Sequence, residues 1–366
     1  MQIFSKGYGV LAFKYIAKHY LRYFFVIMGA LIFFVLGFDY MDNADKFSDS
    51  ANLMLIYFVY KGFYAVDLLL PISLIFAMIA TKIYLIRSNA LVSFFSLGYS
   101  RVEILKPFVY VATAIIFLFI ALHSWSSFSR SQEFSKNILK HSQYLNPTRD
   151  LFFAYKGKYV YFSKLLPLQE RAEGVRVFTI KDGSLKEVVT AKSAEYRNGF
   201  WHIKSGDLIV KPESLSLDSE GIAVSKAKDL DILEGFRPKI LDQVYEGKVN
   251  FTIGDAVDAL LLLQSQNIDV SNIKGALYKI FIYPLFVPFL IVIIYFFVPV
   301  SARFLNVSLF SFAAILTTLL VWGMILMLIE LSNNKTIPSE VGIIGPILIL
   351  AIVAFRQWQK HRLSTE

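Results

Sequence analysis

Four charged residues lie at the ends of long apolar runs, where they could take part in moving an ion or a substrate across a membrane: Asp39, Asp67, Lys279 and Glu330. Charged groups within a membrane are candidates for function because burying them in hydrocarbon is costly. Each of these four lies near the end of its run, where a helix-end or snorkelling explanation serves equally well. A proton-coupled transporter would place carboxylates near mid-span, so the pattern argues against that class.

The residue patterns that other chemistries require are missing from the sequence. There is no cysteine, which excludes disulfides and thiolate sites. The histidines are scattered and show no HxxxH or HExxH spacing. Gly157-Lys158 and Gly247-Lys248 lack the upstream glycine and the following Ser or Thr of a phosphate-binding loop, and no GxSxG occurs. The sequence therefore predicts no catalytic residue, metal or cofactor, and any energy must come from a separate protein such as an ATPase.

The composition indicates a membrane protein that also carries a soluble domain. Of 366 residues, 56% are hydrophobic, and the mean hydropathy is +0.54. A net charge of +9 is explained by basic residues beside membrane spans, so we predict no nucleic acid partner. A spanning helix needs roughly 20 apolar residues. Candidate runs cover residues 21–38, 68–85, 107–122, 281–300, 307–329 and 341–355.

Basic residues cluster on one side of the predicted spans. They occupy the N-terminal arm, the connection from span 2 to span 3 (Lys82, Arg87, Arg101 and Lys106) and the segment after span 6, whereas the loop from span 1 to span 2 is acidic. The positive-inside rule then places both termini in the cytoplasm and the middle segment outside. Residues Lys6 to Tyr20 suit a helix lying in the cytoplasmic interface. Prolines within the spans are either static kinks or hinges of a moving gate: Pro71, Pro284 and Pro288.

Residues 126–268 have the pattern of an antiparallel β domain. Short alternating segments are separated by turn sequences at Lys156-Gly157, Asp182-Gly183 and Asn198-Gly199. This spacing favours a sandwich or roll, and the residues from Phe251 to Gln266 favour a helix leading back to the membrane. Such a domain either offers a sheet edge to a partner's strand or only solubilises the chain around a closed core. We therefore predict three parts, residues 1–125, 126–268 and 269–366.

The segment between spans 2 and 3 has the features of a short surface helix. Leu91, Phe94, Phe95 and Leu97 give it an apolar face, and Gly98 suits the position just after a helix end. A helix of this kind is what an ABC permease presents to its nucleotide-binding subunit. It could equally be an interfacial helix packed on lipid.

Nearly the whole chain resembles the LptF/LptG permease family of lipopolysaccharide export. The resemblance rests on this segment, on the runs LFFAYKGKYVYFSKL and GVRVFTIKDGSLKEVVTAKSAEYRNGFWHI, and on IPSEVGIIGPI before span 6. Two positions depart from the family pattern: Ala90 replaces the glutamate of the coupling helix, and Asp39 replaces a lysine of the LptG branch. Met41-Asp42-Asn43 is closer to the LptG branch than to LptF.

The resemblance implies a membrane α + β fold with six transmembrane helices, three on each side of an inserted, jellyroll-like periplasmic β-roll. It implies an inner-membrane ABC exporter subunit that carries lipopolysaccharide and works with an LptB-like ATPase dimer, an LptF-like second permease and an LptC-like periplasmic partner. The ATPase-coupling residues would be Asn89, Ala90, Leu91, Phe94, Phe95, Leu97 and Gly98. Candidate contacts to lipopolysaccharide phosphates are Lys61, Arg130, Lys136, Lys140 and Lys274, and cavity or hinge candidates are Asp39, Pro71, Pro284 and Pro288.

Two rival classes stay open at this point. One is a membrane-anchored scaffold that docks partners through its β domain, and the other is a mechanotransmitting permease that carries no lipid. The large outer domain of such a permease usually follows the first span, whereas here it follows the third.

Overall fold

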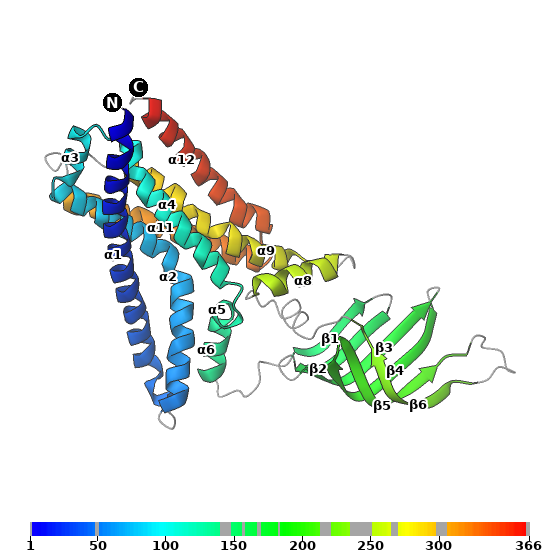
Figure 1. Ribbon diagram of the computed structural model, residues 1–366. Coiled ribbons are helices and arrows are strands. Elements are labelled where there is room, and N and C mark those ends of the chain that lie inside the picture. Colours follow the sequence, from blue (N-terminus) through cyan, green and yellow to red (C-terminus); the bar gives the residue numbers. More distant parts are fainter. Residues whose placement is uncertain are drawn as a thin grey trace. The chain divides into compact units, whose positions relative to one another are not determined.

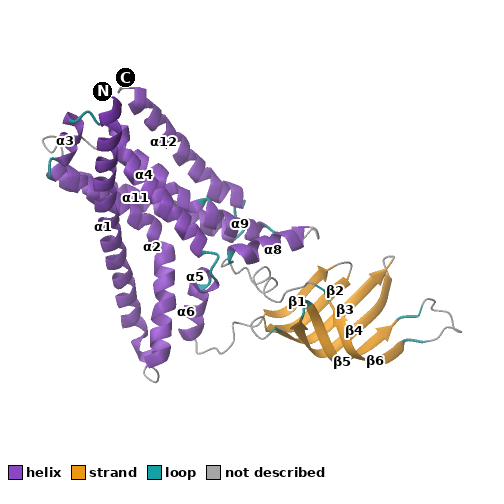
Figure 2. Cartoon of the chain, in the orientation of Figure 1, coloured by secondary structure: helices purple, strands orange, loops and turns teal. Residues whose placement is uncertain are grey.

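The computed structural model describes residues 2–47, 51–139, 148–155, 158–166, 170–181, 184–212, 221–234, 251–264, 270–297 and 306–363. They form two compact units, one made of residues 1–135 with 274–366 and the other of residues 136–273. Figure 2 shows that the first unit is helical and that the second carries the strands.

The helical unit contains the membrane spans (Figure 1). Among the described residues, six helical segments are long and apolar enough to cross a membrane, three before the first strand and three after the last. The predicted membrane α + β class is therefore confirmed. The described helices before the first strand are α1 (Gln2–Asn43), η1 (Ala44–Phe47), α2 (Ala51–Arg87), α3 (Ala90–Ser96), α4 (Arg101–Leu122), α5 (Ser126–Ser129) and α6 (Ser131–Leu139). The described helices from residue 271 onward are α9 (Ser271–Phe281), η3 (Tyr283–Leu285), α10 (Phe286–Phe297), α11 (Val307–Asn333), η5 (Glu340–Ile344) and α12 (Gly345–Leu363).

Local sequence explains where several of these helices begin. Ser100 and Glu103 form a capping box at the start of α4, with the Glu103 N–H 3.2 Å from Ser100 Oγ and the Ser100 N–H 2.8 Å from Glu103 Oε2. Asn306 caps α11 by accepting a hydrogen bond from the N–H of Leu309. These contacts satisfy amide groups that have no partner within the helix.

The N-terminal segment differs from the prediction of a separate helix in the interface. Helix α1 runs without a break over 42 residues, so residues 6–20 continue directly into the first span. A helix of that length extends about 63 Å, roughly twice the thickness of the hydrocarbon core. No proline, glycine or capping side chain lies between Val10 and Met28, and a helix lying in the membrane plane would need such a break before turning into the membrane.

The second unit is built on one antiparallel sheet of β1 (Thr148–Tyr155), β2 (Lys158–Leu166), β3 (Arg171–Lys181), β4 (Ser184–Arg197), β5 (Phe200–Val210) and β6 (Ala223–Ile232). The strand order is β1-β2-β3-β4-β5-β6, so the described strands of the predicted roll form a meander. The predicted turn at Asn198-Gly199 joins β4 to β5, and both residues have positive φ, as a tight hairpin turn requires. The predicted turns at Lys156-Gly157 and Asp182-Gly183 lie outside the described residues. The predicted C-terminal helix of this unit is α8 (Ile253–Gln264).

The sheet is strongly curved (Figure 1), and two glycines permit close approach of its strands. Gly174 in β3 has a φ of 61°, and a Cβ there would lie 2.7 Å from Ser163 Cβ. A Cβ on Gly206 in β5 would lie 2.7 Å from the carbonyl oxygen of Thr190 on β4. One face of the sheet carries a core that includes Phe162, Trp201 and other apolar side chains.

Candidate functional site

Helix α3 ends as the sequence predicts. Gly98 has a φ of 87°, its N–H lies 2.9 Å from the carbonyl of Phe95, and the Tyr99 N–H lies 3.1 Å from the carbonyl of Phe94. This pair of bonds is the Schellman motif, in which glycine adopts the left-handed conformation with little strain. At the other end, Asn89 also has a positive φ, which asparagine tolerates better than most residues. The two ends fix α3 as a short helix directly after α2.

The side chains of α3 divide between the helical core and the surface. Leu91 is buried, and Phe94 packs edge-on against Tyr15 and Tyr99, with ring centroids 6.1 and 5.8 Å apart. Phe95 is also partly buried against the core, and Ala90 with it. The exposed apolar side chains of α3 and its C-cap are Val92, 42% exposed, and Leu97, 71% exposed. A partner protein would therefore meet Leu97 and Val92 before the phenylalanines.

Lys61 and Asp39 form an ion pair between α2 and α1. The Lys61 ammonium lies 2.6 Å from Asp39 Oδ1, and the Tyr57 hydroxyl donates a hydrogen bond to Asp39 Oδ2. Both charged side chains are largely buried, at 20% and 13% exposed. The sequence placed Lys61 among phosphate contacts and Asp39 among cavity residues, and the structure brings the two together.

The other predicted cations have different surroundings. Arg130 is 3% exposed, and its Nε lies 3.0 Å from Glu133 Oε2, with its guanidinium 5.6 Å from the centre of the Phe134 ring. Lys136 is exposed and Lys274 is partly buried. Lys140 lies outside the described residues. Lys61 and Arg130 thus already contact carboxylates, and an anionic ligand would have to compete with those partners.

Asp67 and His123 form a second polar contact, between α2 and the end of α4. His123 Nε2 lies 3.0 Å from Asp67 Oδ1, and Nδ1 lies 3.0 Å from the carbonyl of Phe119. Both ring nitrogens thus have an oxygen partner, one on α2 and one in the last turn of α4. The positive charge of Lys279 in α9 also acts on Asp67. The sequence identified Asp67 and Lys279 as isolated charges but not His123 as a partner.

Lys82 is a buried charge, although its position predicts only a basic residue beside a span. The side chain is 3% exposed, and its Nζ donates to the backbone carbonyl of Tyr295 in α10. The signal that could have identified it is a single lysine within the apolar run 68–85.

The three prolines are buried among the spans. Pro71 lies inside α2, Pro284 at the start of η3 and Pro288 in the first turn of α10. Close packing around them favours the static-kink alternative over the hinge.

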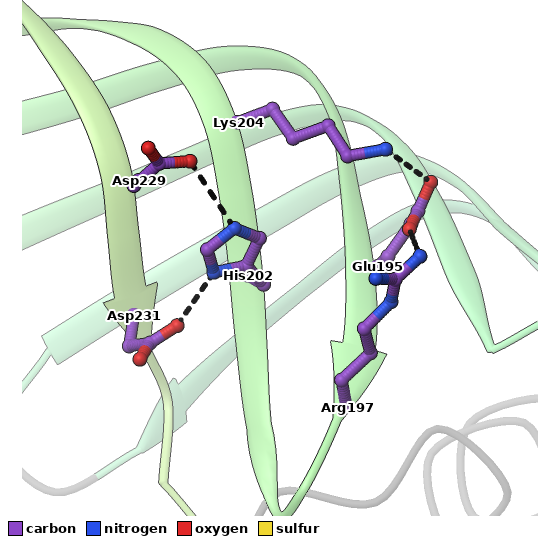
Figure 3. A network of polar contacts seen from close by, with 6 residues as sticks. All are labelled: Glu195, Arg197, His202, Lys204, Asp229 and Asp231. Atoms are coloured by element: carbon purple, nitrogen blue, oxygen red, sulfur yellow. Dashed lines mark hydrogen bonds and ion pairs between the residues drawn. The ribbon is translucent and has the colours of Figure 1, made fainter.

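The polar face of the sheet carries a network of charged side chains (Figure 3). Glu195 lies 3.4 Å from Lys204 and 2.5 Å from Arg197, and the hydrogen bond from Lys204, with the charges of both cations, lowers the pKa of this carboxyl. His202 stands between Asp231 at 2.8 Å and Asp229 at 3.4 Å. Lys204 also lines a hollow of about 550 Å³ with Arg176 and other polar residues. Within the described residues, no cluster of His, Asp and Glu is arranged to hold a metal ion.

A known protein family matches the chain across both the helical unit and the sheet. The model of the lipopolysaccharide export system permease LptF/LptG family matches residues 14–360, from within α1 to within α12. The chain belongs to this family. It is therefore a multi-pass inner-membrane permease subunit of lipopolysaccharide export, as the sequence motifs indicated. No curated protein matches the chain.

Proposed function

We propose that this subunit is one membrane half of an ABC exporter that extracts lipopolysaccharide from the outer leaflet of the inner membrane. Its second unit passes the lipid to a periplasmic bridge, and a separate ATPase supplies the energy. The observation that carries this proposal is the family match over residues 14–360, which includes α3 and the whole sheet. In this arrangement both termini are cytoplasmic and residues 126–268 are periplasmic, as the distribution of basic residues favours.

Helix α3 is the proposed contact with an LptB-like ATPase dimer. Its two defined ends hold a rigid element after α2, and Leu97 and Val92 present apolar surface. Apolar anchors of this kind contribute strongly to an interface when a partner's pocket encloses them. Ala90 is partly buried, so a charged contact at this position is replaced by apolar packing.

Helices α1 and α11 are the proposed walls of the lipid cavity shared with an LptF-like second permease. Only 11% and 22% of the residues in the apolar stretches of these two helices are buried within the chain, against 61% in α2. Their exposed side chains include Phe33, Phe34, Phe312 and Leu320. Surfaces of this composition suit acyl chains and a facing helix. Lys61, Arg130, Lys136, Lys140 and Lys274 are the proposed cations for the lipid's phosphates.

Affinity purification of the chain from native membranes in mild detergent tests the proposal. We expect an ATPase, a second six-span permease, an LptC-like protein and bound lipopolysaccharide to co-purify. Recovery of the chain alone, or with soluble partners and no ATPase, would contradict it.

Deletion of residues 91–97 separates the exporter from the two rival classes. In an exporter the deletion abolishes binding of the ATPase and delivery of lipid. A membrane scaffold would keep its partners and its activity without α3. A mechanotransmitting permease would lose ATPase binding, but the purified wild-type complex would contain no lipopolysaccharide.

A further inference from the structure

Lys82 of α2 contacts both the backbone and the side chain of Tyr295 in α10. Its Nζ donates a hydrogen bond to the backbone carbonyl of Tyr295 and lies 3.7 Å from the centre of the Tyr295 ring. The lysine and the tyrosine are each 3% exposed. A lysine in an apolar environment is costly unless its ammonium finds such partners. The contact therefore holds the Lys82 side chain of α2 against α10.

Lys82 of α2 donates to a backbone carbonyl near the C-terminal end of the described part of α10. Tyr295 lies in the last described turn of α10, and residue 299, four positions further on, is a proline, which has no N–H to donate to the Tyr295 carbonyl. The last four carbonyls of a helix have no partner within it, and a cation near that end is favourable. Lys82 provides a donor for one of these carbonyls, and the two residues are 213 positions apart in the sequence.

Tyr295 is also the centre of contacts with other spans. Its ring lies 6.1 Å from that of Phe108 in α4, and the neighbouring Phe296 stacks on His361 of α12 at 4.2 Å. Helix α2 continues for only five residues beyond Lys82, about 8 Å, before it ends at Arg87. Helix α3 begins three residues later, at Ala90. The path from α3 to Lys82 thus consists of a two-residue turn, Ser88-Asn89, and the last five residues of α2.

We propose that Lys82 is a positioning residue that transmits movement of α3 to α10, so that the two move together. This inference rests on the proposed function, in which the ATPase moves α3. Lys82 gives α2 and α10 a directed hydrogen bond, whereas the apolar side chains of the two helices in the shared core can slide past one another more easily. Without the Lys82 contact, ATP hydrolysis would continue with little movement of α10.

The mechanical link can be measured on the full chain without transport. The sequence has no cysteine, so Val92→Cys in α3 and Phe297→Cys in the last described turn of α10 give two unique labelling sites, both exposed. Spin labels on these cysteines report the distribution of distances between α3 and α10 in lipid nanodiscs. We expect Lys82→Met, which keeps the length of the side chain but removes the donor, to broaden that distribution at least twofold.

Tyr295→Phe is the matched control, because it keeps both the carbonyl and the ring face and should leave the distribution unchanged. If Lys82→Met does not fold, Lys82→Leu serves as a second apolar replacement with the same expected broadening. A distribution in the Lys82 variant that superimposes on that of the parent chain would overturn the inference.

A second measurement compares ATP hydrolysis with lipid delivery in the reconstituted complex. We expect the Lys82→Met complex to retain its ATPase and hydrolyse ATP within about twofold of wild type, while lipid delivered per ATP falls about tenfold. Equal loss of both activities, with their ratio unchanged, would indicate a merely structural role and refute the inference. If the wild-type complex delivers no lipid, the proposed function fails, and the label distances still decide whether Lys82 links the two helices.

Discussion

The ammonium of Lys61 lies 2.6 Å from the carboxylate of Asp39, and the hydroxyl of Tyr57 donates to the same carboxylate. Within the family resemblance, Asp39 stands where the LptG branch carries a lysine. The cation near this position is instead Lys61, and Asp39 is its partner within the chain. A lipid phosphate that binds Lys61 must displace Asp39, so the ion pair lowers the affinity of Lys61 for the phosphate.

Asp39→Asn is predicted to strengthen binding of a phosphorylated lipid. The amide can still accept the hydrogen bond from Tyr57, but it no longer neutralises Lys61. This largely buried pair contributes about 1 kcal/mol, which corresponds to roughly a fivefold lower Kd for the phosphorylated lipid. Binding of lipid A with and without its phosphates, measured in nanodiscs, checks the prediction. Lys61→Met should abolish the difference between the two lipids, and a gain that is equal for both would argue against this role for Lys61.

Leu97→Asp is predicted to remove the ATPase without unfolding the permease. Leu97 is 71% exposed, so a carboxylate there is solvated in the free subunit but costly in an apolar interface. We expect the amount of co-purifying ATPase to fall at least about tenfold, as for loss of an interface anchor. Phe94→Asp should lower both the ATPase yield and the melting temperature, because the Phe94 ring packs against Tyr15 and Tyr99. Full retention of the ATPase by Leu97→Asp would place the contact elsewhere.

Local features of the fold could be predicted from the sequence because their causes are local. Hydropathy over some twenty residues defines a span wherever it folds, and Asn198-Gly199 and Gly98 permit the positive φ that their turns require. The continuity of α1 differs from the prediction because lysines among apolar residues at positions 6–20 favour an interface, whereas no proline, glycine or capping side chain between Val10 and Met28 ends the helix.

The polar contacts within the membrane unit could not be predicted in this way. Lys82 and Tyr295 are 213 residues apart, and Asp67 and His123 are 56 apart. Their pairing depends on how the helices pack and rotate against one another, which hydropathy does not encode. For the same reason, the pairing of Lys61 with Asp39 could not be predicted from the sequence.

Gly206→Ala is predicted to loosen the sheet between β4 and β5. The new Cβ would lie 2.7 Å from the Thr190 carbonyl oxygen, so the two strands must separate. Overpacking of this kind costs about 1–3 kcal/mol, or roughly 5- to 150-fold faster amide exchange in these strands. Hydrogen exchange of peptides from residues 184–210 measures the effect. Gly221→Ala is the matched control, because no atom lies within 4 Å of its added Cβ.

Asp67 and His123 are predicted to be energetically coupled. Removing the carboxylate leaves the His123 ring with an unsatisfied nitrogen, whereas removing both groups leaves neither unsatisfied. A double-mutant cycle with Asp67→Leu, which removes the acceptor, and His123→Phe should give a coupling energy of about 1–3 kcal/mol. Reversible unfolding of the purified chain in SDS supplies the four free energies. Additive effects would mean that the contact does not join α2 to α4 in the membrane.

Glu195 is predicted to stabilise the sheet in a pH-dependent manner. Lys204 and Arg197 lower its pKa below the ordinary value of 4.5, so the folded state favours the carboxylate more than the unfolded state does. The stabilisation is therefore complete above pH 4.5 and is lost as the pH falls through the lowered pKa. Glu195→Gln should lower the melting temperature of the sheet at pH 7, and the difference from wild type should shrink towards pH 3. A difference from wild type that stays constant with pH would show that Glu195 acts through packing rather than charge.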